Sequence, residues 1–536
     1  MKALKLFAVT ALCLIGISSC TTNFEEINKN PNKLTYGDIQ AYNMLEPLLY
    51  GMGGYYQYHA GYWTNNLIQY TCYVSGATRY LATYYALSNG HWQTIWDNYA
   101  RLASDANHML QLATTEGKED PFYEGVALTL KALNLYSLTT IFGDIPYKEA
   151  FKFSENLTPA FESQEEVLGE IVADLGKAAD IFATAPKTGN GGMDSMYGDS
   201  AAKWRKFANS LKMRALCVLT GISDNYWTSI QTMVDDPASY PVFASNADNA
   251  KIPFQTVDPY TNQMGPKEVP SMFDAYNLTE KMIALTTIKD ADGNDLYQDP
   301  RLVIFATQKG GKWTGAVAGC LKQDFNTEMN KKPATMNADV LHRDDMDAFV
   351  MDYSEILFIL AEGVQLGKLS VAGQTAKSLY EAAVRANIEK WAPYITYNTK
   401  YREITSAAVI DYLASDLASY DKAAAGEGLY GSALELILSQ KWLSLYWTGG
   451  FEPYTHWRRC EYPILTIGDG TDANQYELPT RFGYPNYTVS TNSANVQAAL
   501  ERMGGPNDMH TPLDWSYKKR NGGSRNPHPL ANSTNQ

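Results

Sequence analysis

Two segments with strong helical periodicity follow one another in the first third of the chain. Residues 91–113 place apolar side chains at the three- and four-residue spacing of a single helix face. Asp120 and Pro121 then begin a second helical segment, which Gly143 ends. An amphipathic helix must bury its apolar stripe against a neighbour, so helices joined by short connections predict a scaffold of packed helix pairs.

Further helical segments extend this pattern along the chain. Ser163 and Glu166 form a capping box, and an apolar stripe follows them: Val167, Ile171, Leu175, Ala178 and Phe182. Other helices are predicted over 201–220, 353–366, 371–391 and 432–447. No fixed repeat length relates these segments, so periodicity alone predicts helical hairpins and a loop-rich lobe, with nothing more specific.

The loop-rich lobe is predicted from turn residues. Residues 223–349 contain Asp-Pro, Gly-Gly and Asp-Gly-Asn turns with few sustained stripes, which is typical of long loops and short strands. We therefore expect a mainly α protein, with its helical scaffold at about 37–222 and 350–450. The variable lobe then takes 223–349 and 451–517, and 518–536 forms a polar, poorly ordered tail.

The first 20 residues resemble an export signal. Lys2 and Lys5 precede an apolar run of about a dozen residues, which is too short to cross a bilayer of roughly 30 Å as a helix. Small residues before Cys20 are typical of a bacterial lipoprotein cleavage site, and an ordinary secretory signal is the alternative. We predict a signal over 1–19, an acylated Cys20 as lipid anchor, and a polar tether over 20–36.

Charge and cysteine content narrow the possible partners. Removing the two signal lysines changes the formal net charge from −14 to −16, which makes nucleic acid an unfavourable partner. After Cys20, four cysteines remain far apart without a CxxC pair, which disfavours a zinc site. Their spacing favours no disulfide pairing, and we expect isolated buried thiols: Cys72, Cys217, Cys320 and Cys460.

Motifs of catalysis and of cofactor binding are absent from the sequence. It contains no HExxH, no GxSxG and no glycine-rich phosphate loop, so we predict no enzyme activity and no cofactor. Asp290, Asp292 and Asn294 have the first spacings of a calcium loop, but Arg301 occupies the position of its final glutamate. A polar hairpin turn is therefore expected there, and no metal site.

Several stretches along the chain resemble the SusD/RagB family of nutrient-binding lipoproteins of Bacteroidetes. They are 142–150 (FGDIPYKEA), 203–214 (KWRKFANSLKMR), 353–362 (YSEILFILAE) and 437–446 (ILSQKWLSLY). Smaller agreements occur after Cys20, at 299–302 and at 481–485. The resemblance covers essentially the whole mature chain and keeps the order of the family's motifs.

The resemblance implies a fold, a location and a partner. The fold is a stack of tetratricopeptide-like helix pairs that supports a loop-rich lobe. The location is the cell surface, on the outer membrane and anchored by lipid. The partner is a SusC-like TonB-dependent barrel, whose outer mouth the lipoprotein covers as a hinged lid while it delivers nutrient.

The charged residues within these motifs are interpreted as structural. One set lies at helical spacing and is expected to join helix ends: Trp204, Arg205, Asn209 and Arg214. A second set is expected to form a polar network between a helix and a loop, or alternatively to line the surface that faces the barrel: Gln440, Lys441, Glu452, Arg458 and Arg459.

The ligand site is sought among aromatic side chains, because pyranose C–H faces stack on Trp and Tyr. The densest supply is 55–85, and we name Trp63, Arg79, Tyr80 and Tyr84 there as ligand-binding candidates. Trp313, flanked by glycines, and Tyr260 with Asn262 in a long loop complete the set. Helical spacing favours the core for three other tyrosines: Tyr62, Tyr70 and Tyr73.

The expected cargo is an oligosaccharide, captured without chemical change. A peptide cargo is the alternative within the same class, because an aromatic groove with hydrogen-bonding groups suits both. A structural lid with little affinity of its own is a third possibility. Resemblance of fold does not fix the cargo.

Overall fold

The computed structural model describes most of the chain after the N-terminal segment. The described residues are 39–73, 82–152, 155–185, 193–270, 273–398, 400–401, 403–526 and 528. The predicted signal, Cys20 and the tether to residue 36 lie outside them, and so do Arg79 and Tyr80.

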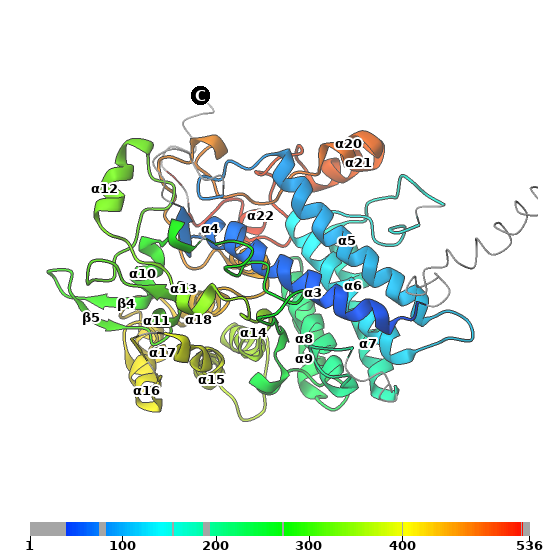
Figure 1. The fold of residues 1–536 in the computed structure, drawn as a ribbon, viewed down its shortest axis with the longest axis horizontal. Coiled ribbons are helices and arrows are strands. Elements are labelled where there is room, and N and C mark those ends of the chain that lie inside the picture. Colours follow the sequence, from blue (N-terminus) through cyan, green and yellow to red (C-terminus); the bar gives the residue numbers. More distant parts are fainter. Residues whose placement is uncertain are drawn as a thin grey trace, which may run out of the picture.

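The N-terminal half is a row of long helices. They are α3 (Tyr42–His59), α5 (Asn89–Ala113), α6 (Pro121–Phe142), α7 (Gln164–Thr184) and α8 (Ala201–Leu219). From α5 to α8, each helix packs against the next, and α3 packs on α5 (Figure 1). The mainly helical fold with paired helices is therefore confirmed.

The central helix of this row, α6, is buried on nearly all sides. Asp120 caps it by accepting a bond from the Tyr123 N–H, Pro121 occupies its first turn, and Gly143 ends it at φ 98°. By length and composition this helix could cross a membrane, but 94% of its most apolar window is buried inside the protein. It is the core helix of the stack.

The capping box predicted for α7 is present. The Ser163 hydroxyl accepts from the Glu166 N–H, and the Glu166 carboxylate accepts from the Ser163 N–H at 2.9 Å. The predicted stripe from Val167 to Phe182 is buried against α6 and α8. Local sequence and packing agree here, which explains why this helix was predictable.

A second group of helices packs against the first. Its main members are α14 (Tyr353–Gln365), α15 (Ala376–Trp391) and α18 (Ala433–Ser444). Helix α14 packs on both of the others and on α8, which joins the two groups around one core. Smaller helices border them: α9 (Tyr226–Asp235), α16 (Ser406–Ala414) and α17 (Tyr420–Ala424).

Between these groups lies the lobe of short elements. The strands are β1 (Thr71–Tyr73), β2 (Ala250–Ile252), β3 (Tyr276–Leu278), β4 (Thr287–Lys289), β5 (Asp295–Gln298), β6 (Ala306–Thr307), β7 (Thr335–Met336) and β8 (Ala348–Met351). The short helices are α4 (Asn65–Leu67), α10 (Glu280–Thr286), α11 (Leu302–Phe305), α12 (Phe325–Asn330) and α13 (Ala338–Leu341). The sheets have the orders β1-β3-β7-β6, β2-β8 and β4-β5, with antiparallel pairing throughout.

Residues 518–526 differ from the prediction of a poorly ordered tail over 518–536, and 529–536 lie outside the described residues. After α19 (Glu452–Cys460), α20 (Asn486–Thr491) and α21 (Ser493–Met503), the chain forms α22 (Tyr517–Asn521). Beyond it, the Arg525 guanidinium donates to the Cys460 carbonyl, and the Ser524 hydroxyl donates to the Glu461 carboxylate at 2.7 Å. Polar composition was misleading because these side chains find partners on α19.

The charged motif residues lie inside the helical core. The Arg214 guanidinium of α8 makes a two-pronged ion pair with the Glu355 carboxylate of α14, at 2.7 and 2.6 Å. Arg459 of α19 pairs in the same way with Glu362 of α14. The predicted structural role of these motifs is confirmed for both arginines, because each joins two helices and is almost wholly buried.

Two further members of the predicted polar network also have partners within the protein. The Gln440 amide oxygen accepts from Arg301, which is itself paired with Asp299. The Arg458 guanidinium donates to the backbone carbonyls of Thr480 and Thr140. This network connects α19 to α6 and to the loop at Thr480, and α18 to the segment at Arg301.

Candidate functional site

Three of the predicted aromatic ligand residues are buried. Trp63 is 7% exposed, Tyr84 6% and Trp313 3%. The prediction that these rings face solvent is wrong. The Trp313 indole N–H donates to the Gln298 amide oxygen at 2.6 Å, so the ring packs beside the β4–β5 hairpin, where it borders a hollow with Lys289 and Lys331. Flanking glycines therefore did not signal exposure.

The two loop candidates, Tyr260 and Asn262, differ in their exposure to solvent. Tyr260 is 37% exposed, while Asn262 is fully buried. The Asn262 amide donates to the Gln57 side chain at 2.7 Å and to the Arg343 carbonyl at 3.1 Å, which fixes its loop against α3. Asn262 is therefore a structural clamp, and Tyr260 keeps an accessible ring. A ligand role for Arg79 and Tyr80 stays a prediction.

A π-helical turn explains why Trp63 was misplaced. Residues Ala60–Thr64 form a π-helix between α3 and α4, which adds one residue to a helical turn. Helical spacing counted through this turn is wrong by one position. Tyr70 is buried as predicted, but Tyr62 and Tyr73 are only half-buried, and the neighbour Trp63 occupies the core.

The solvent-facing positions of this segment are occupied by one residue type. From 52 to 72, every residue that keeps partial exposure is a tyrosine, namely Tyr55, Tyr58 and Tyr62, and all the others are buried. We call these three side chains, with Tyr73 and Tyr276 beside them, the tyrosine strip. Sequence reasoning did not name Tyr55 and Tyr58 as candidates; the small residues that flank them, Gly53, Gly54, Ala60 and Gly61, were the available signal.

The strip is a set of ring contacts between α3 and the sheet. The rings of Tyr58 and Tyr62 lie 4.7 Å apart, and Tyr62 meets the edge of Tyr276 at 6.4 Å. Tyr276 also contacts Tyr73 at 5.5 Å, because β1 and β3 pair these two residues directly. Backbone pairing therefore holds one end of the strip in place.

The Tyr58 and Tyr62 rings of the strip are uncharged, whereas the Arg101 guanidinium lies over the Tyr55 ring, 5.3 Å from its centroid. Burial raises the pKa of Tyr58 and of Tyr62 above the ordinary value, so both phenols stay protonated at physiological pH. Behind them, burial lowers the pKa of His59 to about 3, and its ring lies 3.1 Å from the Tyr99 hydroxyl. Apolar ring faces with neutral hydroxyl groups are suited to stacking on sugars and to bonding their hydroxyls.

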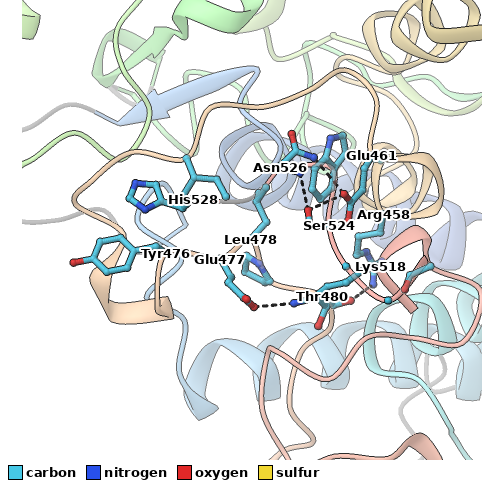
Figure 2. Close-up of a pocket in the computed structure, with 16 residues that line it drawn as sticks. Arg458, Glu461, Tyr476, Glu477, Leu478, Thr480, Lys518, Ser524, Asn526 and His528 are labelled. Atoms are coloured by element: carbon cyan, nitrogen blue, oxygen red, sulfur yellow. Dashed lines mark hydrogen bonds and ion pairs between the residues drawn. The ribbon is translucent and has the colours of Figure 1, made fainter. Parts of the chain in front are cut away.

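A cavity lies at the C-terminal end of the chain, away from the tyrosine strip. This cavity, of about 370 Å³, lies between α19, the segment 476–480 and residues 516–528. Figure 2 shows Tyr476 and His528 on one side of the open space, and Lys518 near Thr480 across from them. Glu461 and Asn526 line it as well.

The polar groups around this cavity already have partners. The Glu477 carboxylate accepts from Lys518 at 2.8 Å, and the Glu461 carboxylate accepts from Ser524 and Asn526. His528 stacks on Tyr476 and contacts the Asp469 carboxylate at 2.9 Å. Bonds that hold the C-terminal segment use these groups, so the tyrosine strip is the better candidate for capturing a ligand.

Metal and thiol chemistry find little support in the part of the chain that is described. No group of three or more His, Cys, Asp or Glu side chains there is arranged to hold a metal ion. Asp290 instead accepts from the Asn294 backbone and side chain, which is the predicted polar turn, here between β4 and β5. The four cysteines after Cys20 are free and buried, as predicted.

Solved structures with the same fold come from several Bacteroidetes. A SusD homologue from Parabacteroides distasonis aligns with a TM-score of 0.76 at 20% identity, over 92% of this chain and 100% of that one. A SusD homologue from Bacteroides fragilis gives 0.72 at 21% identity, over 89% and 99%. A chitin-binding SusD homologue from Flavobacterium johnsoniae gives 0.67 at 20% identity, over 89% and 98%.

The family model gives a sequence-level match over most of the chain. Among proteins with curated functional descriptions none matches. The model described as "Starch-binding associating with outer membrane" matches residues 31–485, a range that contains the long helices, the sheets and the tyrosine strip. On this match the chain belongs to the SusD-like family of outer-membrane nutrient-binding proteins.

Proposed function

We propose that this protein captures an oligosaccharide on the tyrosine strip at the cell surface. One observation carries the proposal: every partly exposed residue from 52 to 72 is a tyrosine. Family membership supports a nutrient-binding role, and the chitin-binding relative is a precedent for sugar ligands on this fold. The binding step involves no chemical change to the ligand.

The strip binds by stacking and by hydrogen bonding. Sugar C–H faces lie against the rings of Tyr58 and Tyr62, and the phenol hydroxyls exchange bonds with sugar hydroxyls. The rings are partly immobilised by Tyr276 and Tyr73 before any ligand arrives, which lowers the entropy lost on binding. A preformed site of this kind favours capture without a large rearrangement.

Delivery completes the proposed role. Acylation of Cys20 anchors the protein to the outer membrane, and the captured sugar passes to a SusC-like TonB-dependent barrel that the protein covers as a hinged lid. The family description, which places its members with the outer membrane, supports this arrangement.

The test is a calorimetric titration of the mature chain without Cys20 against a panel of polysaccharide fragments and a peptide digest. We expect one glycan to bind, with the affinity reduced about two- to tenfold in Tyr58→Ala and in Tyr62→Ala, since a stacked ring contributes about 0.5–1.5 kcal/mol. The matched controls Tyr58→Phe and Tyr62→Phe keep the ring and are expected to retain most of the affinity.

Two results contradict the proposal. Binding of peptides but of no glycan assigns the strip to a peptide cargo. If the folded protein binds no member of the panel, the strip is not an autonomous binding site. The protein would then be a lid that acts only together with its barrel.

A further inference from the structure

A second aromatic group lies farther along α3, in the N-terminal direction. The Tyr50 ring meets the edge of Tyr260 at 5.7 Å and the edge of Phe254 at 5.7 Å. The Tyr50 hydroxyl donates to the Thr261 carbonyl at 2.9 Å, which attaches the loop to the helix. Phe254 is buried, whereas Tyr260 keeps 37% of its surface exposed.

Gln263 connects this group to the tyrosine strip. Its side chain lies beside the Tyr50 hydroxyl and rests directly on Gly54, where a Cβ atom would come within 2.3 Å of the Gln263 amide. Gly54 lies one helical turn before Tyr58 and one turn after Tyr50. The half-exposed amide therefore fills the gap between the two aromatic groups, and only glycine lets it approach so closely.

The combined surface is long. Tyr50 and Tyr62 are twelve residues apart, and a rise of 1.5 Å per residue places them roughly 18 Å apart along the helix axis. Tyr260 extends the surface beyond Tyr50. This distance exceeds the span of a single sugar ring several times, so the surface suits a chain of linked rings.

Charge around this surface is unevenly distributed. The carboxylates of Glu268 and Asp258 lie near Tyr50 and contribute to the rise of its pKa, after burial as the main cause. Lys267 offsets one of them through a 3.5 Å contact with Asp258. The pKa of Tyr58 is raised by burial alone, and that of Tyr62 by burial and then by Tyr58, so neither shift has a carboxylate among its causes, in contrast to Tyr50.

We propose that the ligand surface runs from Tyr62 over Tyr58, Gln263 and Tyr50 to Tyr260, and that it selects an extended, uncharged saccharide chain. This inference rests on the proposed function and adds ligand length and charge to it. Acidic sugars such as uronates are disfavoured, because their carboxylates meet Glu268 and Asp258 in a protein that already carries net negative charge. Gln263 supplies an uncharged amide that donates to and accepts from hydroxyls in the middle of the track.

The first test measures affinity against chain length. A series of neutral oligosaccharides of the bound glycan, from one unit to about eight, is titrated into the wild-type protein and into Tyr260→Ala. We expect wild-type affinity to rise with each added unit until the track is filled. Tyr260→Ala is expected to bind short members normally and long members about three- to tenfold more weakly, with Tyr260→Phe as the control that keeps the ring.

The second test measures charge selection. An oligouronate matched in length to the tightest neutral ligand is expected to bind at least tenfold more weakly, and Glu268→Gln is expected to narrow that gap. Equal affinity of the two ligands overturns the neutral-chain inference. The extended track is overturned if Tyr260→Ala weakens the affinity for short and long oligosaccharides equally. It is also overturned if Tyr260→Ala weakens neither affinity.

These outcomes are separable from failure of the proposed function. If no glycan binds the wild-type protein, or if Tyr58→Ala and Tyr62→Ala bind normally, then the tyrosine strip itself is not the site. If those variants lose binding while Tyr260→Ala behaves like wild type at every length, then the strip is the site and its extension is wrong.

Discussion

The buried ion pairs and the tyrosine strip differ in what their sequences suggest and in what they do. The pairs Arg214–Glu355 and Arg459–Glu362 involve charged motif residues, and each pair is closed within the protein. The strip consists of tyrosines at helical spacing that resemble core, yet Tyr55, Tyr58 and Tyr62 reach solvent.

The difference teaches where to look for function in such a fold. A buried charge needs a partner, so a matched charge inside the helical stack is already committed to structure. A neutral, partly exposed ring needs no such partner and still presents part of its surface to solvent. Under the proposed function, partial exposure of a ring indicates the ligand site better than the presence of charged motif residues does.

Breaking an ion pair is expected to have the largest effect. Glu355→Ala leaves the buried Arg214 guanidinium with the Val350 carbonyl as acceptor and with Glu452, at 3.9 Å, as its nearest carboxylate, and should reduce the free energy of unfolding by about 3–5 kcal/mol. Denaturant unfolding measures this. Replacing both partners together, with Arg214→Met and Glu355→Leu, is expected to cost less than the single change; an equal or larger cost would contradict the assigned role.

Substitutions of two neighbouring residues at the π-helical turn separate a role in stability from a role in binding. Trp63→Ala opens a cavity in the core and should cost about 3 kcal/mol of stability while the folded fraction keeps its glycan affinity. Tyr62→Ala is expected to do the reverse, losing affinity with a smaller loss of stability. Unfolding curves and titrations of the two variants measure both properties; a loss of affinity in Trp63→Ala at full folding would place that ring in the site.

The smallest expected effect concerns pH at the C-terminal cavity. Hydrogen bonds from His510, and from Lys518, lower the pKa of Glu477 to about 2 from its ordinary value of 4.5. A lowered folded-state pKa stabilises the fold above the unfolded value, and this contribution disappears as pH falls from about 4.5 towards 2. Glu477→Gln should therefore be less stable than wild type at pH 7, and the gap should close in acid.

Thermal unfolding at several pH values measures this gap. The matched control is Glu116→Gln, an exposed glutamate, which should follow wild type throughout. A gap that stays constant down to pH 2 would mean that Glu477 stabilises the cavity by packing and not by its charge.

Sequence reasoning predicted the elements whose local signals agree with their packing. The helix α6, begun by Asp120 and Pro121 and ended by Gly143, and the capping box of α7 are present with nearly the predicted bounds. The structural role of Arg214 was also predicted, because an arginine within a helical motif more readily joins helix ends than contacts a ligand. These cases depend on spacing within one segment.

The candidate site was harder to predict because exposure depends on distant segments. Trp313 is buried by the β4–β5 hairpin, and Asn262 by its bonds to Gln57 and Arg343. Nothing adjacent in sequence indicates either contact. For Tyr62 and Trp63 the obstacle was local: a π-helical turn has no simple sequence signature, and spacing counted across it assigned the two rings to the wrong sides.

The π-helical turn at Ala60–Thr64 also affects how readily this surface can evolve. Because the turn holds one residue more than an α-helical turn, removing a single codon there would return the segment to ordinary helix and shift the side chains on one side of the deletion by one position relative to the other. Tyr62 and Trp63 would then compete for the same orientation. Ligand preference in such a protein can thus change through one insertion or deletion, with every aromatic residue inherited intact.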